Sequence, residues 1–528
     1  MSVSGVSIIA GKGVVGTDDT MRAVNPTTNE AFGPDFTLLS PDQISQAVAT
    51  AAEAFDSYRN TEPTTRAKFL DAVADNISAV RDEIVTIAVA ETGISENIID
   101  SEINRTIDQL RLFAQKIRQG DFHGVRIDPA LPDRMPTPRV DIRQCKVPLG
   151  PVVVFGASNF PLAFSVAGGD TVSALAAGCP VIVKAHNAHP GTSEIVGFAL
   201  AKAVQNQGLH PGVFSLVYGA GIKVGQQLVS DERIAAVAFT GSRAGGLAIA
   251  KTVANRPIPI PVYAEMSATN PVFVLPGAIK GDSSELAKGF VSSVTNRSGQ
   301  LCTSPGQIFV PTGADGDAFL ETVKQEFRAV TGKTMLTSDI ADAWIHGVES
   351  IRSRQHVNDL VIGHQGFTAN APAPTLVSTT LEAFNSDDAM SVEVFGAFSL
   401  IVRYNDASEL PGTVARMEGQ LTGTIQAENE DEQAARALIR ALELKVGRIL
   451  VGGWPTGVEV GPAMVHGGPF PATTDSRTTS VGTLAIERFL RPVAYQTVPD
   501  KLLPPQLQDG NPWHLIRSVN GQLPQPDQ

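Results

Sequence analysis

Short apolar strands alternate with helices from residue 150 onward, and this alternation limits the possible folds more than any other feature of the chain. The expected strands cover residues 151–155, 180–184, 213–218 and 235–239, and the expected helices cover residues 165–177 and 191–205. Strands and helices that alternate in this way form a parallel sheet with helices on both faces. A second α/β set runs from about residue 270 to residue 465. We therefore expect an α/β fold with two Rossmann-like, doubly wound domains.

The flanking segments have a different pattern. Ser40-Pro41-Asp42-Gln43 combines a capping serine, a proline at the first helical position and a glutamine three residues on, so it predicts the start of a helix. The helical pattern continues to about residue 120. Residues 121–149 are rich in Pro and Arg and predict a hairpin that reaches out of the main body, residues 480–498 predict a strand, and a Pro/Gln-rich tail follows.

Composition excludes several classes of partner. The 528 residues carry a net charge of −13, which disfavours binding to nucleic acid or to an anionic membrane surface. Three cysteines lack the number and spacing of a disulfide framework or a zinc site, so we expect no metal. No signal-peptide pattern and no apolar run of about 18 residues is present. We expect a soluble, cytoplasmic protein.

One cysteine stands apart from the other two. Cys145 and Cys179 lie in apolar runs and are expected to be buried, inert side chains. Cys302 lies in the small, polar stretch Ser298-Gly299-Gln300-Leu301-Cys302-Thr303, where a substrate can approach the sulfur. Because only the thiolate is a nucleophile, we expect its surroundings to favour the anion.

Several other chemically capable residues lie at the ends of expected strands, where open α/β sheets bind ligands. Phe239-Thr240-Gly241-Ser242 ends a strand and opens a helix, and such a helix N-terminus suits a diphosphate. The glycines of the 219–225 turn, including Gly225, give weaker evidence of the same kind. Lys184 ends another strand, and Asn159 lies in a strand-end turn where its amide can donate to an oxyanion.

Two glutamates follow apolar residues. Glu265 comes after Val262-Tyr263-Ala264, and Glu393 lies in Val392-Glu393-Val394-Phe395-Gly396. Apolar surroundings raise the pKa of a carboxyl group, so both are expected to have raised pKa values, and Glu265 is a candidate general base.

The order of these features resembles the aldehyde dehydrogenase superfamily over nearly the whole chain. The resemblance implies that Cys302 is the nucleophile, that Asn159 helps to form the oxyanion hole, and that Glu265 activates water to hydrolyse a thioester. It also implies a nicotinamide dinucleotide cofactor. The residues implied to bind it are Lys184, Asn187, Gly225, Thr240, Gly241, Ser242, Glu393 and Phe395.

The same resemblance assigns a role to each part of the chain. Residues 1–120 and 150–264 are implied to form the cofactor-binding domain, and residues 265–479 the catalytic domain. Residues 121–149 and 480–528 are implied to form an oligomerisation hairpin and an oligomerisation strand with a tail. The hairpin and the strand are expected to pair across a subunit boundary, which implies a dimer or a tetramer.

The chain departs from the family pattern in places that bear on the cofactor. Glu265-Met266-Ser267-Ala268 replaces the usual Glu-Leu-Gly-Gly, and Arg297 replaces the usual asparagine five residues before the cysteine. NAD-preferring relatives carry a glutamate three residues after the ribose lysine, and the neutral Asn187 stands there instead. Because Asn187 cannot repel a 2′-phosphate, we expect NADP to be used well, with NAD possible, and Lys223 or His186 to meet the phosphate.

The sequence around the expected site residues resembles one branch of the family. The stretches at 146–156, 188–192 and 466–473 resemble the α-ketoglutaric semialdehyde (2,5-dioxopentanoate) dehydrogenases. Such a substrate carries a carboxylate, so Arg105, Arg297 and Arg477 are candidates for a bidentate clamp. Phe160 and Phe164 are expected to line the substrate tunnel.

Other functions stay open on the sequence. A broad-specificity or fatty aldehyde dehydrogenase is the main alternative, and a non-catalytic nucleotide-binding protein is another. A CoA-acylating enzyme is disfavoured by Glu265. A cysteine hydrolase is disfavoured because the sequence places no histidine beside Cys302.

Overall fold

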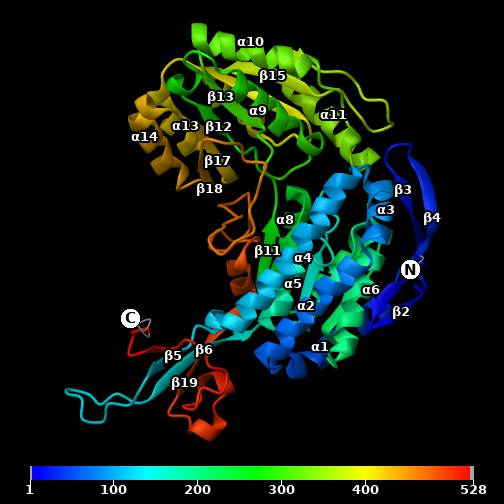
Figure 1. The fold of residues 1–528 in the computed structure, drawn as a ribbon, viewed down its shortest axis with the longest axis vertical. Coiled ribbons are helices and arrows are strands. Elements are labelled where there is room, and N and C mark those ends of the chain that lie inside the picture. Colours follow the sequence, from blue (N-terminus) through cyan, green and yellow to red (C-terminus); the bar gives the residue numbers. More distant parts are fainter. Residues whose placement is uncertain (1–2, 524–528) are drawn as a thin grey trace.

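The computed structural model describes residues 3–523 and has two large mixed sheets, each covered by helices on both faces (Figure 1). This arrangement confirms the predicted fold class. The ends of the predicted N-terminal segment and tail, residues 1–2 and 524–528, lie outside the described part. Among residues 3–523, none of the helices combines the length and the apolar character that crossing a lipid bilayer requires.

The first sheet has the strand order β11-β10-β7-β8-β9-β1-β2, with a parallel core from β11 to β9. Its strands are β1 (Ser7–Ile9), β2 (Lys12–Val14), β7 (Val152–Phe155), β8 (Val181–Lys184), β9 (Phe214–Val217), β10 (Ala236–Thr240) and β11 (Val262–Glu265). The chain adds β8 and β9 on one side of β7, and β10 and β11 on the other. The carboxyl ends of β7 and β10 therefore flank the point where the strand order reverses, which is where such sheets bind ligands.

Side chains alternate between the two faces of this sheet. Val152 and Val154 pack with one group of helices, whereas Val153 packs with the other group. The first group is α2 (Pro63–Ala79), α3 (Arg81–Thr92), α4 (Glu96–Gln119), α5 (Gly169–Ala177) and α6 (Pro190–Asn206). The second group is α1 (Pro41–Arg59), α7 (Gly221–Ser230) and α8 (Arg243–Ala254). Helix α1 starts at the predicted Ser40 capping box.

The second sheet has the order β14-β15-β16-β13-β12-β17-β18 and is parallel except for β14. Its strands are β12 (Val272–Val274), β13 (Gln307–Pro311), β14 (Asn358–Ile362), β15 (Thr375–Thr380), β16 (Phe398–Tyr404), β17 (Gln420–Gln426) and β18 (Val446–Val451). Helices α9 (Ser284–Thr295) and α10 (Ala314–Arg328) cover one face. The other face carries α11 (Ser338–Arg352), α12 (Leu381–Ser386), α13 (Leu410–Arg416) and α14 (Glu432–Leu442).

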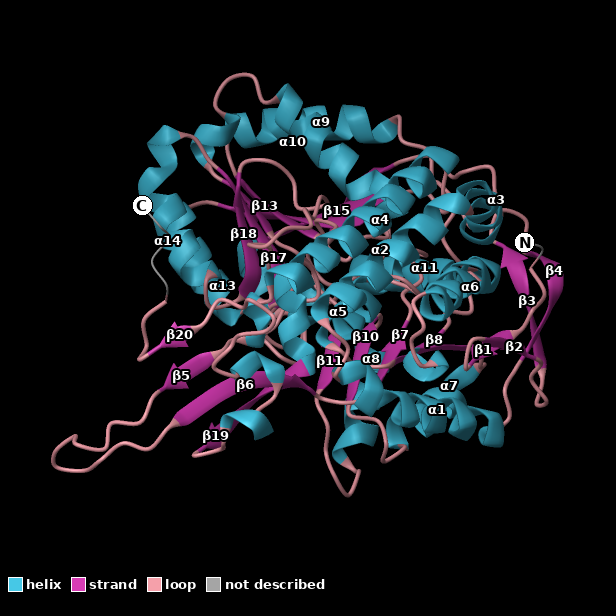
Figure 2. Cartoon of the chain, turned by 60° about the horizontal axis from the view of Figure 1, so that its bottom comes forward, coloured by secondary structure: helices cyan, strands magenta, loops and turns pink. Residues whose placement is uncertain are grey.

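A smaller four-stranded sheet forms an arm that extends away from both large sheets (Figures 1 and 2). Its order is β19 (Leu490–Gln496), β6 (Ile142–Pro148), β5 (Arg126–Asp128) and β20 (Ser518–Val519). Strands β6 and β19 pair antiparallel within one chain, so the expectation that these segments pair across a subunit boundary is wrong. Part of the predicted tail also folds back, because Leu503, Leu507 and Leu515 are buried on the arm. Separate from these sheets, β3 (Thr20–Asn25) pairs with β4 (Glu30–Thr37).

Candidate active site

Two cavities meet at Cys302. One, of about 600 Å³, runs along the carboxyl ends of β7, β8 and β10, and the other, of about 760 Å³, opens between α4 and the 456–466 loop. The Cys302 side chain lines both cavities. A ligand in either cavity can therefore reach the same sulfur.

An unusual backbone path presents this sulfur. Arg297, Ser298 and Gly299 all have left-handed φ angles, of 48°, 59° and 69°. A Cβ on Gly299 would lie 2.2 Å from the Gly396 backbone, so only glycine fits there. The Asn270 side-chain amide then donates to the carbonyl oxygens of Cys302, at 2.8 Å, and Ser304, at 3.0 Å. These contacts fix the loop that carries the nucleophile.

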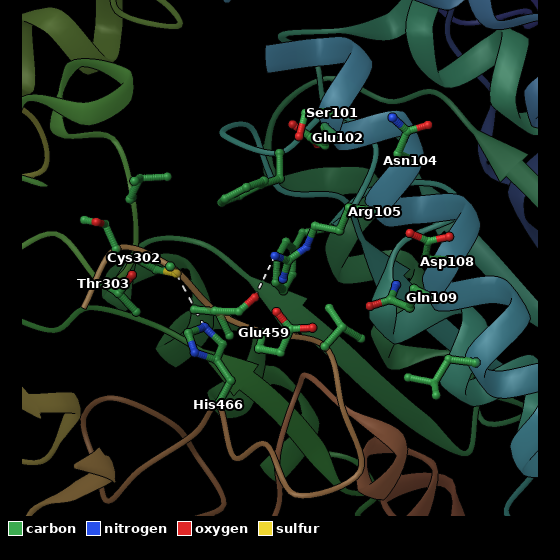
Figure 3. A pocket seen from close by; sticks show the side chains of 18 of the residues that line it. Ser101, Glu102, Asn104, Arg105, Asp108, Gln109, Cys302, Thr303, Glu459 and His466 are labelled. Atoms are coloured by element: carbon green, nitrogen blue, oxygen red, sulfur yellow. Dashed lines mark hydrogen bonds between the residues drawn. The ribbon is translucent and has the colours of Figure 1, made fainter. Parts of the chain in front are cut away.

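The Cys302 sulfur belongs to a buried polar network that sequence analysis missed. His466 Nε2 lies 3.4 Å from Cys302 Sγ (Figure 3). The same nitrogen lies 2.9 Å from Glu265 Oε1. The Ser480 hydroxyl donates to Glu265 Oε2 at 2.7 Å. In the sequence, His466 stands out only as part of the His466-Gly467-Gly468-Pro469 stretch. No spacing rule places this histidine beside a cysteine 164 residues away.

The charges in this network differ from those expected. Burial raises the pKa of the Cys302 thiol well above its ordinary value, and the carboxylates of Glu265 and Glu393 raise it further. The expectation that the surroundings favour the thiolate is therefore wrong. Burial also acts to raise the pKa of Glu265, but His466, Ser480 and Cys302 together outweigh it and lower that pKa. The predicted raised pKa of Glu265 is wrong, because its sequence neighbours are apolar whereas its carboxylate faces polar partners.

Asn159 lies beside the nucleophile loop. Its side-chain amide donates to the carbonyl oxygen of Gln300 at 3.1 Å, and the residue lines the smaller cavity together with Cys302. An amide nitrogen carries two hydrogens. The bond to Gln300 uses one, which leaves the second for an oxygen held at Cys302.

The smaller cavity collects most of the residues expected to bind a cofactor. Lys184, Gly225, Thr240, Gly241, Ser242, Glu393 and Phe395 line it. Asn187 does not line it but accepts a hydrogen bond from Lys184 Nζ at 2.8 Å. His186 also lines it, whereas Lys223 does not. Sequence analysis missed Met266, Ile340 and Trp344, which form apolar parts of the wall.

This cavity fits a dinucleotide. Ser242 caps α8 and accepts a hydrogen bond from the Gly245 N–H at 3.2 Å, so the positive end of the helix faces the cavity. The Thr240 hydroxyl is buried and has no hydrogen-bond partner among the described residues. A polar ligand atom would satisfy it.

Two titratable groups in the cavity have strongly shifted pKa values. Burial lowers the pKa of Lys184 to about 8. Burial raises the pKa of Glu393 to about 8, and the nearby Glu265 adds to this effect. The predicted raised pKa of Glu393 is confirmed.

The three candidate arginines differ in their position relative to the larger cavity. Arg477 is 87% exposed and pairs with Asp475, and it does not line the cavity. Arg297 lines it, but forms an ion pair at 3.0 Å with the fully buried Glu102. The Arg297 guanidinium also stacks on Phe160, 4.5 Å from the ring centroid. Arg297 is therefore committed to holding α4 against the nucleophile loop.

Arg105 has a different environment. It lines the cavity from α4 (Figure 3). Its side chain donates to the Val458 carbonyl oxygen at 2.7 Å and lies over the Phe164 ring. Its buried Nε has no partner among the described residues. Arg105 is therefore part of the cavity wall and not a solvated surface residue. Phe160 and Phe164 line the cavity as predicted.

Comparisons with known proteins show which family the sequence matches. The model of the aldehyde dehydrogenase family matches residues 14–469. The chain is 48% identical over 522 residues to alpha-ketoglutaric semialdehyde dehydrogenase 2 of Azospirillum brasilense, which covers 99% of both chains. It is 43% identical over 533 residues to alpha-ketoglutaric semialdehyde dehydrogenase of Acinetobacter baylyi, again covering 99% of both.

Solved structures show the same fold at lower identity. Betaine aldehyde dehydrogenase of Staphylococcus aureus in complex with NAD+ superposes with a TM-score of 0.79 at 19% identity, over 94% of this chain and 95% of that one. A 3,6-anhydro-L-galactose dehydrogenase superposes with a TM-score of 0.78 at 20% identity, over 93% of this chain and 99% of that one. The match of the family model and the two full-length relatives lead to one conclusion: this chain belongs to the aldehyde dehydrogenase family.

Proposed function

We propose that this chain oxidises 2,5-dioxopentanoate to 2-oxoglutarate with NADP as the preferred cofactor. The observation that carries the proposal is the position of Cys302, whose side chain lines both the dinucleotide-shaped cavity and the cavity that contains Arg105. The two full-length relatives named for this activity support the choice of substrate.

The reaction proceeds on the sulfur. The Cys302 thiolate adds to the aldehyde carbon, and the oxygen that becomes negative receives an N–H from Asn159. A nicotinamide dinucleotide held in the smaller cavity would supply the hydride acceptor, and loss of the hydride from this carbon leaves a thioester on Cys302. Glu265 then takes a proton from water, the hydroxide adds to the thioester carbon, and the carboxylic acid leaves with the thiol restored.

The cofactor preference follows from Asn187. Its neutral amide contacts Lys184 Nζ, so the position next to the ribose lysine carries no negative charge. A 2′-phosphate therefore meets no repulsion there, and the cationic Lys184 attracts it. NAD lacks this attraction and is used less well.

Arg105 is the residue that recognises the distal carboxylate. Its guanidinium lies in the cavity wall and, among the described residues, donates only to the Val458 carbonyl oxygen, whereas Arg297 is already paired with Glu102. A guanidinium with free donors binds a carboxylate through parallel hydrogen bonds. Arg105 thus favours an aldehyde that ends in a carboxylate.

The assembly and the location of the protein complete the proposal. The arm has β19 at its edge, and an exposed strand edge readily pairs with another chain, so we infer a homo-oligomer, either a dimer or a tetramer. Three unpaired cysteines suit the cytoplasm. Light scattering coupled to size exclusion gives the number of subunits.

A substrate panel tests the proposed activity. Purified enzyme is assayed with 2,5-dioxopentanoate, succinic semialdehyde and medium-chain aldehydes, each with NADP and with NAD. The proposal expects the highest kcat/KM for 2,5-dioxopentanoate with NADP. A higher kcat/KM for medium-chain aldehydes would assign the alternative broad-specificity activity, and a higher value with NAD would reject the cofactor preference.

A further inference from the structure

His466 occupies a fixed position between the two groups that carry the chemistry. The residue is 1% exposed, and its Nε2 contacts Cys302 Sγ at 3.4 Å and Glu265 Oε1 at 2.9 Å. Its backbone is held at both ends, because its N–H donates to Thr479 Oγ1 and its carbonyl oxygen accepts from Ser480. These contacts fix the backbone from which the ring projects. Figure 3 shows it directed at the sulfur.

The contacts of Glu265 show where the ring carries its hydrogen. An ionised carboxylate only accepts hydrogen bonds. Its Oε2 receives the Ser480 hydroxyl, and its Oε1 faces His466 Nε2, so Nε2 must be the donor. His466 Nδ1 is buried and has no partner among the described residues, so nothing there accepts a second ring hydrogen. The contact with the carboxylate therefore places a ring hydrogen on Nε2.

The Nε2–H group of His466 thus has two acceptors within reach, Glu265 Oε1 and Cys302 Sγ. The Cys302 sulfur, a Glu265 carboxylate oxygen and a His466 ring nitrogen all lie within 4.8 Å of one another, so thiol, carboxylate and imidazole form one compact group. The charged groups that act on the sulfur are Glu265 and Glu393, which oppose a thiolate, and the more distant Arg105, which favours it. His466 supplies the hydrogen-bond donor in direct contact with the sulfur.

We propose that His466 is a catalytic residue whose Nε2–H group changes its hydrogen-bond acceptor between Glu265 and Cys302 during the reaction. While the sulfur is a thiol, Nε2–H binds the Glu265 carboxylate. When the thiol passes its proton to Glu265, the carboxyl group becomes a poor acceptor and Nε2–H turns to the thiolate. After the thioester has formed and Glu265 has lost its proton to solvent, Nε2–H binds the carboxylate again and holds it toward the attacking water.

This inference rests on the proposed roles of Cys302 and Glu265, and it assigns two effects to one side chain. Removing the N–H makes the thiolate harder to form. It also removes a donor from Glu265 and slows the hydrolysis of the thioester. A histidine that only filled space would produce neither effect when replaced by a ring of similar size.

The test compares His466→Phe, which keeps a ring but has no N–H, with His466→Gln, whose side-chain amide keeps a donor. His346→Phe, at an exposed histidine of α11, is the matched control. The rate of Cys302 alkylation by iodoacetamide is followed against pH in the cofactor-free enzyme, with the modified peptide identified by mass spectrometry. A rapid-mixing experiment follows the burst of reduced cofactor.

The expected result is an apparent thiol pKa about one unit higher in His466→Phe and alkylation about tenfold slower at pH 7. We expect His466→Gln to recover most of the rate and His346→Phe to match the wild type. His466→Phe should also show a burst followed by a slow steady state. If His466→Phe does not fold, His466→Met replaces it as the variant without a donor.

An alkylation profile in His466→Phe or His466→Met that coincides with the wild-type profile would overturn the inference. A decrease of the alkylation rate in His466→Gln as large as that in the variant without a donor would overturn it too. Failure of the proposed function looks different, because Cys302→Ala would then still oxidise aldehydes.

Discussion

The Asn270 side-chain amide lies 2.8 Å from the carbonyl oxygen of Cys302, and this contact ties the nucleophile loop to the start of β12. Thr422 holds the other end of the amide by donating to Asn270 Oδ1 at 3.1 Å. The loop is therefore anchored on the second sheet.

Replacement of Asn270 by Ala is expected to loosen this loop. The carbonyls of Cys302 and Ser304 lose their donor, so the free energy of unfolding falls by about 1–3 kcal/mol, and kcat falls as well. Denaturant unfolding and steady-state kinetics measure both quantities. Asn255→Ala, at the end of α8, is the control. Unchanged kcat in Asn270→Ala would show that the anchor is dispensable.

Glu393 gives the protein a dependence of stability on pH. Its pKa in the folded protein is about 8, above the ordinary value of 4.5, so the folded state binds more protons than the unfolded state between these values. The stability that Glu393 contributes is fully present below pH 4.5 and is lost as the pH rises through about 8. We expect Glu393→Gln to flatten the decline in Tm between pH 5 and pH 9. Parallel Tm profiles for both proteins would contradict this prediction.

Asn187→Glu is expected to reverse the cofactor preference. A carboxylate three residues after Lys184 repels a 2′-phosphate and leaves NAD unaffected by that charge. The ratio of kcat/KM for NADP to that for NAD should fall at least about tenfold. Asn206→Glu, at the exposed end of α6, adds the same charge elsewhere and should leave the ratio unchanged. A similar fall in both variants would point to net charge rather than to position.

Arg105→Gln is expected to lower kcat/KM for 2,5-dioxopentanoate. Losing a hydrogen bond to a charged group costs about 1.5–3 kcal/mol, or roughly 10- to 150-fold. An uncharged aldehyde of similar length should be affected far less. Arg477→Gln, at an exposed arginine outside the cavity, is the control. Equal losses for both aldehydes in Arg105→Gln would rule out a carboxylate clamp.

Features fixed by local chemistry could be predicted from the sequence. The Ser40 capping box starts α1, and the strand-end residues Lys184 and Thr240 line one cavity because the carboxyl ends of parallel strands share an edge. Ser242 caps α8 as its position after a strand suggests.

Contacts between distant segments could not be predicted in the same way. His466 and Ser480 reach Glu265 across 201 and 215 residues, and no local pattern encodes such a meeting. The predicted direction of the Glu265 pKa shift is wrong for the same reason, since the shift depends on these partners rather than on the adjacent Ala264. The β6–β19 pairing within one chain likewise depends on how the arm folds back.

The acyl-enzyme tests the central claim most directly. Glu265→Gln is mixed with 2,5-dioxopentanoate and NADP, quenched with acid and digested, and the peptide containing Cys302 is weighed. We predict that this peptide gains the mass of the acyl group and that Cys302→Ala shows neither the adduct nor cofactor reduction, whereas Cys145→Ala behaves like the wild type. Undiminished oxidation of aldehyde by Cys302→Ala would contradict the account.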